Sequence, residues 1–108
     1  MKVEDFTTGT TEAHRLAVHG NYGMLLKALE AEPELVNAKD KNKWTPLHEA
    51  VRGSSQAIIE LLVEKGADIN AEASGGLTPL DLATEFKGKD HPIVSLLRDL
   101  GAKMGPEL

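Results

Sequence analysis

Residues 45–70 decide the fold of this chain, and they read TPLHEAVRGSSQAIIELLVEKGADIN. Thr45 is placed to cap a helix with its hydroxyl group, and Pro46 suits the first helical position, where a missing N–H costs nothing. The apolar residues that follow recur at helical spacing and form a stripe on one face: Leu47, Ala50 and Val51. This stretch predicts a short helix that begins at Pro46 and is broken by Gly-Ser-Ser at 53–55.

A second helix is predicted directly after this break. Ser55 can cap its start, and Gly66 can end it. Five residues between them are large and apolar, which is too many for a helix with only one covered side: Ile58, Ile59, Leu61, Leu62 and Val63. We therefore expect neighbouring helices to cover it on more than one side, as they do in a stack.

The same pattern recurs along the chain. Thr-Pro-Leu-Asp at 78–81 aligns with Thr-Pro-Leu-His at 45–48, and Ala17, Ala50 and Ala83 fall in the same register. The chain divides into units of residues 10–42, 43–75 and 76–108, with a two-residue insertion near 87–90 in the third unit. Each unit is a helix–turn–helix that cannot bury its own apolar faces, so we expect a single domain of three stacked units.

The second unit carries Thr-Pro-Leu-His-x-Ala, then Ile-Ile-x-Leu-Leu, then Gly-Ala-Asp-Ile-Asn, and it resembles the ankyrin repeat. The third unit resembles it well. The first is degenerate, because Glu-Ala-His-Arg at 12–15 replaces the first motif and loses its N-cap and proline. The resemblance implies an all-α fold, a short ankyrin-type solenoid of three stacked helix–turn–helix repeats with finger turns between them. It also implies that the His48 imidazole is structural and bridges backbone and hydroxyl groups between repeats.

Both ends of the chain depart from this motif. The polar residues at 12–15 would suit an end without a neighbour, and Gly105 stands where an asparagine would begin another finger. These features predict polar caps and a complete short array. The alternative is a segment cut from a longer array.

Composition narrows the function classes. The 108 residues include no cysteine, which excludes disulfides, cysteine-ligated zinc and a thiol nucleophile. A net charge of −5 disfavours nucleic-acid binding, which needs a positive field. No apolar run is long enough for a signal peptide or a membrane span. We therefore expect an intracellular protein, cytoplasmic or nuclear, that binds neither nucleic acid nor membrane.

No set of residues predicts catalysis. The sequence has no Gly-x-Ser-x-Gly elbow and no phosphate-binding glycine loop. His14 and His19 are five residues apart, a spacing that puts them on different faces of a helix. We therefore expect no enzyme activity, no metal, no cofactor and no small-molecule substrate.

The resemblance implies that the finger turns and the first helices form a concave face whose variable positions select a protein partner. Trp44 and Leu77 occupy equivalent positions at two finger bases, and an apolar patch is predicted there. The alternative for Trp44 is local, with its ring bracing the turn before the helix. The predicted partner-binding residues are Lys41, Lys43, Trp44, Glu49, Arg52, Ser74, Leu77 and Glu85.

The sequence therefore predicts a non-enzymatic protein–protein interaction module, an adaptor, scaffold or inhibitor that acts as a monomer through a rigid concave face. Two alternatives stay open. The chain could be a regulatory or targeting domain of a larger multidomain enzyme, or a structural spacer without a dedicated partner.

Two asparagines allow one further expectation. Each of them follows a β-branched residue and has a leucine eight positions before it, and they are Asn37 and Asn70. This pattern resembles the substrates of an asparaginyl hydroxylase. The alternative is that both side chains close their finger turns by hydrogen bonds.

Overall fold

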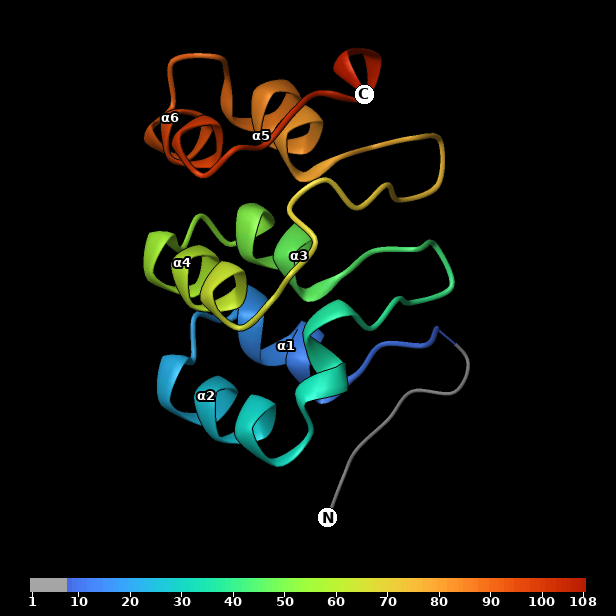
Figure 1. The fold of residues 1–108 in the computed structure, drawn as a ribbon, viewed down its shortest axis with the longest axis vertical. Helices are drawn as coiled ribbons and strands as arrows, with labels where there is room; N and C mark the ends of the chain where they lie inside the picture. Colours follow the sequence, from blue (N-terminus) through green and yellow to red (C-terminus); the bar gives the residue numbers. More distant parts are fainter. Residues whose placement is uncertain (1–7) are drawn as a thin grey trace.

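The computed structural model describes residues 8–108 and shows a stack of helix pairs (Figure 1). The N-terminal stretch that bears on a signal peptide lies outside the described residues. In chain order the elements are α1 (Glu12–Val18), α2 (Tyr22–Ala31), the 3₁₀ helix η1 (Pro33–Asn37), α3 (Pro46–Arg52), α4 (Gln56–Glu64), α5 (Pro79–Lys87), α6 (Pro92–Asp99) and the 3₁₀ helix η2 (Gly105–Glu107).

The helices stand in two columns along the longest axis of the molecule, which measures 39 Å. The first helices of the units (α1, α3 and α5) form the inner column, and α2, α4 and α6 form the outer one (Figure 1). The segments between units project as fingers on the side away from the outer column. The predicted all-α solenoid is confirmed, since residues 8–108 contain six α-helices and no β-strand longer than an isolated bridge, such as the one between Ala73 and Leu77.

The predicted helix boundaries follow from capping. The Thr45 hydroxyl accepts a hydrogen bond from the backbone N–H of His48, and Pro46 occupies the first helical position. Ser55 caps α4 in the same way by accepting from the N–H of Ile58. These bonds satisfy N–H groups that have no partner inside the helix, so the chain begins each helix at a defined residue.

The core is the set of apolar faces between the units. Helix α4 lies at the centre of the outer column and buries four large side chains, as its dense apolar pattern predicts: Ile58, Ile59, Leu61 and Leu62. Fully burying a side chain of this size contributes about 1.5–3 kcal/mol. Because these side chains lose their cover if a neighbouring unit is removed, the stability of one unit depends on the next.

The start of the first unit differs from the sequence prediction. Its N-cap is not lost, because Thr11 caps α1 and accepts from the N–H of His14. His14 is buried and takes the place of His48, so the motif in the first unit lies one residue earlier than a strict 33-residue offset puts it. Helix α2 has ten residues against nine in α4, which absorbs the difference. The residues at 12–15 are therefore not a polar cap.

Two buried imidazoles join successive units. The N–H of Thr45 donates to Nδ1 of His48 at 3.2 Å, so Nδ1 is an acceptor and the proton sits on Nε2. That Nε2 donates to the carbonyl oxygen of Leu77 in the next unit at 2.9 Å. His14 repeats the arrangement, with Nε2 donating to the carbonyl oxygen of Trp44 at 2.7 Å. The structural role expected for His48 is confirmed.

The third unit has a carboxylate at the same position. Oδ2 of Asp81 accepts from the N–H of Thr78 and from the N–H of Gly105, both at 3.0 Å. The direction of the long-range bond is reversed, since a carboxylate accepts where an imidazole N–H donates. Asp81 therefore attaches the start of η2 to the start of α5.

Gly53 marks a close approach between α1 and α3. It is the C-cap of α3, and a methyl group in its place would lie 2.5 Å from the carbonyl oxygen of Val18. Its backbone is in the ordinary right-handed helical region, so the requirement for glycine comes from space and not from conformation.

We predict that His48 makes stability depend on pH. Burial is the main cause that lowers the pKa of His48 below its usual 6.5. Between this lowered pKa and 6.5 the unfolded chain binds more protons than the folded protein does. The free energy of unfolding therefore rises with pH across that window, and this contribution to stability is lost as the pH falls through it. Urea unfolding from pH 5 to 8 should show a steeper rise in the wild type than in His48→Gln. A pKa of 6.5 or above in an NMR titration of the His48 ring would contradict this prediction.

Gly53→Ala should destabilise the stack by about 1–3 kcal/mol, because the added methyl group forces α1 and α3 apart. The matched control is Gly23→Ala in α2, where a methyl group meets nothing within 4 Å. The substitution at Gly23 should raise the free energy of unfolding by up to about 1 kcal/mol, since it lowers the entropy of the unfolded chain. Urea unfolding measures both, and equal effects of the two substitutions would show that the contact with Val18 carries no cost.

Candidate protein-binding face

The finger before α3 is a turn built around Asp40. Its Oδ1 accepts from the backbone N–H groups of Asn42 and Trp44 at 2.8 and 2.9 Å. Lys43 adopts a left-handed backbone conformation, with φ of 63°, which lets the chain reverse within this turn. The turn fixes the direction in which the chain enters α3 and so positions Trp44.

Backbone hydrogen bonds also join the fingers to one another. The N–H of Lys41 donates to the carbonyl oxygen of Thr8 at 2.7 Å, and the N–H of Ser74 donates to the carbonyl oxygen of Asn42 at 2.9 Å. Each finger is thus attached to its neighbour through main-chain atoms. The exposed side chains of Lys41 and Ser74 are left available to other molecules.

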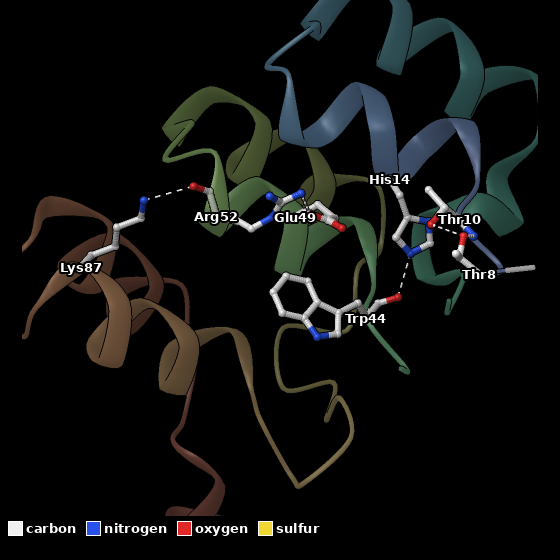
Figure 2. Close-up of polar contacts among 7 residues, drawn as sticks. All are labelled: Thr8, Thr10, His14, Trp44, Glu49, Arg52 and Lys87. Atoms are coloured by element: carbon white, nitrogen blue, oxygen red, sulfur yellow. Dashed lines mark hydrogen bonds and ion pairs between the residues drawn. The ribbon is translucent and has the colours of Figure 1, made fainter. Parts of the chain in front are cut away.

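Trp44 is half-buried at the base of its finger (Figure 2). Its ring lies 5.6 Å from the ring of His48, centroid to centroid, at an angle of 40°. Its carbonyl oxygen receives the hydrogen bond from His14 that joins the first two units (Figure 2). The main chain of Trp44 therefore serves the stack, while part of its ring remains open to solvent.

The open part of the Trp44 ring lines a pocket of about 260 Å³ between α3 and α5. The walls come from both helices, with apolar groups on most sides and two cationic side chains at the helix ends. The lining residues are Trp44, Val51, Arg52, Leu82, Phe86 and Lys87. We call this cavity the Trp44–Phe86 pocket.

A second pocket of about 300 Å³ lies between α1 and α3, and Arg52 lines both cavities. Nη2 and Nε of Arg52 each lie 2.8 Å from Oε1 of Glu49, which sits with Arg52 on α3 (Figure 2). The second pocket is lined by Thr10, His14, Arg15, Val18, His19, Glu49 and Arg52.

The structure brings together three of the predicted partner-binding residues, since Trp44, Glu49 and Arg52 line these adjacent pockets. Leu77 lines neither pocket. Its side chain packs against the core, and its carbonyl oxygen receives the bond from His48. Outside both pockets lie four exposed residues, Lys41, Lys43 and Ser74 on the fingers and Glu85 on α5.

Sequence reasoning missed Phe86 and Lys87. Helix α5 has nine residues where α3 has seven, so both lie in a final half-turn that the pattern of the second unit does not contain. The available signal was the spacing of Leu82 and Phe86, four residues apart on one helical face. Phe86 remains 70% exposed.

Clusters of metal-ligating side chains and helices able to span a membrane are both absent from residues 8–108. These residues contain no group of three or more histidine, aspartate or glutamate side chains placed to hold a metal ion. In the same range, no helix is both long and apolar enough to cross a bilayer.

The model of the ankyrin-repeat family matches residues 8–107 with three copies of the repeat. The chain belongs to the ankyrin-repeat family. Ankyrin repeats are protein-interaction modules and are generally not catalytic.

Three relatives show how such units occur in longer proteins. Over 87 residues, or 81% of this chain, it is 36% identical both to alpha-latrocrustotoxin-Lt1a of Latrodectus tredecimguttatus and to the human NAD-capped RNA hydrolase NUDT12. Over 75 residues, or 69% of the chain, it is 37% identical to the serine/threonine-protein kinase VIK of Arabidopsis thaliana. The matched parts span only 6%, 18% and 17% of those proteins, respectively.

Asn37 and Asn70 connect successive ankyrin units. The side chain of Asn37 donates to the carbonyl oxygen of Gly66 and accepts from the N–H of Asp68. Asn70 accepts from the N–H of Lys103 in the same way. The amides therefore do not close their own finger turns, as one alternative held, but hold the equivalent turn of the next unit.

We predict that Asn37→Ala lowers the free energy of unfolding by about 1 kcal/mol, because two inter-unit hydrogen bonds are lost at a site that water reaches. Asn42→Ala is the matched control. It lies on the exposed finger, where the bond to Ser74 comes from the backbone, and it should change stability by less than about 0.5 kcal/mol. Urea unfolding compares the two variants, and an Asn37 effect no larger than the control would refute the bridging role.

Proposed function

We propose that this ankyrin-repeat chain is a non-enzymatic protein–protein interaction module, an adaptor, scaffold or inhibitor, that binds its partner on the face formed by α1, α3, α5 and the fingers. The observation that carries the proposal is the pair of adjacent pockets along this face, with a tryptophan and an arginine at their junction. Tryptophan and arginine are the side chains most enriched among residues that dominate binding energy.

The mechanism is rigid display. Main-chain bonds hold the fingers to one another, and imidazole bonds hold each finger base to the preceding unit. A partner that docks on a surface already in place avoids the cost of ordering this chain, which improves affinity without new contacts. The proposal takes the chain as a monomer in an intracellular compartment, in keeping with the absence of cysteine.

A second candidate is a regulatory or targeting domain within a larger enzyme. The relatives favour it, since NUDT12 is named as a hydrolase and VIK as a kinase, and the matched part is less than a fifth of each. In that case the same face would contact either a catalytic domain of the same polypeptide or a protein that the enzyme must reach.

The test is direct binding to a partner identified by affinity purification and mass spectrometry. Lys41→Ala/Trp44→Ala/Arg52→Ala should weaken that binding at least about tenfold, because it removes the tryptophan and arginine anchors. Circular dichroism and thermal unfolding check that the variant keeps its helices.

The matched control places three alanines at exposed positions of the outer helices, Lys27→Ala/Glu60→Ala/Ser95→Ala. It should bind the partner as the wild type does. Binding that survives the inner-face variant, or that is lost in the outer-face variant, would reject the proposed face.

A further inference from the structure

We propose that the Trp44–Phe86 pocket holds one bulky apolar side chain of an acidic linear segment in the partner. The carboxylates of that segment would pair with Lys87 and Arg52 at the pocket rim. This inference rests on the proposed function and specifies the chemistry of the partner.

The apolar part of the occupant follows from the walls and size of the pocket. Four of its six lining residues are apolar: Trp44, Val51, Leu82 and Phe86. A cavity of about 150 Å³ already accommodates benzene, so about 260 Å³ is ample for one leucine, methionine or phenylalanine side chain. Such a side chain would cover apolar surface that now faces water.

Phe86 does not belong to the hydrophobic core of the stack. It lies outside the hydrophobic core cluster and is 70% exposed, on the two-residue extension of α5. An aromatic ring exposed beside a tryptophan-lined cavity is typical of a binding site, where aromatic anchors meet an apolar group from the partner.

The acidic part follows from charge. The Trp44–Phe86 pocket is lined by two cations, Arg52 and Lys87, and by no acidic residue. The chain as a whole carries a net charge of −5, so a pocket lined by cations alone stands against the general trend, although Arg52 also pairs with Glu49 outside this pocket. A segment with carboxylates next to its apolar anchor complements it.

Both cations keep donors for a ligand. Nζ of Lys87 donates to the carbonyl oxygen of Arg52 at 3.1 Å, which uses one of its three donors and fixes the ammonium group at the end of α3 (Figure 2). Arg52 uses Nε and Nη2 on Glu49, and its guanidinium has five N–H donors in all. The cations are thus held in place but not saturated.

The adjoining pocket gives the segment a direction. It shares Arg52 with the Trp44–Phe86 pocket, and Arg15 lines it as a second cation beside the carboxylate of Glu49. Lys87, Arg52 and Arg15 stand at successive helices α5, α3 and α1, along the long axis of the stack. The acidic residues are therefore expected on the side of the anchor that runs toward α1.

The experiment uses a random dodecapeptide library displayed on phage and selected on immobilised protein. Selection on the wild type should enrich peptides with one Leu, Ile, Met or Phe close to two or more Asp or Glu residues. Selection on Phe86→Ala/Lys87→Gln should recover these peptides at least about tenfold less well, because both the anchor contact and a rim cation are gone. Tyr22→Ala/Lys65→Gln is the matched control, since it removes an exposed aromatic ring and a lysine away from the pocket.

Trp44 reports on the pocket directly, because it is the only tryptophan in the chain. A synthetic tryptophan-free copy of the leading peptide should change its fluorescence, and raising NaCl from about 50 to about 500 mM should weaken the titrated affinity. Replacing the acidic residues of the peptide with their amides should weaken its affinity at least about tenfold, and so should replacing its apolar residue with Ala.

Three results would overturn the inference: no enrichment over a blank surface, enriched peptides without acidic residues, or enrichment that Phe86→Ala/Lys87→Gln leaves intact. None of them decides the proposed function. The inner-face variant that carries Trp44→Ala could lose binding to the native partner while Phe86→Ala/Lys87→Gln retains it. That result would support the proposed interaction face and contradict the proposed pocket chemistry.

Discussion

The hydrogen bond from a buried neutral imidazole to the carbonyl oxygen at the next finger base is the interaction on which the rest depends. His14 makes it to Trp44 and His48 makes it to Leu77. Each imidazole accepts at Nδ1 from the start of its own helix and donates at Nε2 to the next unit, so one ring fixes both a helix start and a unit-to-unit distance. The bond at the helix start requires a neutral ring, because a proton on Nδ1 would meet the N–H group that now donates to it.

The candidate binding face is a consequence of this bond. Once the carbonyl of Trp44 is held by His14, its ring has a fixed place beside α3, and the pocket forms between that ring and α5. Gly53 keeps the other end of α3 close to Val18. The Lys87 ammonium then reaches the carbonyl oxygen of Arg52 and ties α5 to α3. The pocket is therefore built from contacts that also maintain the stack, which is how a small core poor in aromatic residues can present a rigid surface.

The sequence predicted most of the fold, because caps, prolines and apolar spacing are local signals that the stack does not override. It failed where one residue shifted the register, since Thr11 and His14 keep their roles without the proline and leucine of the motif. The candidate face was predictable at Trp44, Glu49 and Arg52, because the repeat pattern places them at a finger base and on a first helix. Phe86 and Lys87 were not, because they lie in a helix extension specific to the third unit, and the inward packing of Leu77 depends on neighbours that no local pattern shows.

Part of the pocket wall also maintains the stack, since Val51 and Leu82 belong to the hydrophobic core. Phe86 and the Arg52 side chain take no part in the imidazole bonds, so they can change to suit a partner while the fold stays the same. Trp44 serves both the stack and the pocket, but through different atoms, with its carbonyl oxygen in the stack and its ring in the pocket. A side-chain substitution there leaves the main-chain acceptor in place. The scaffold therefore leaves the identity of the exposed side chains open, which is how one repeat architecture can serve unrelated partners.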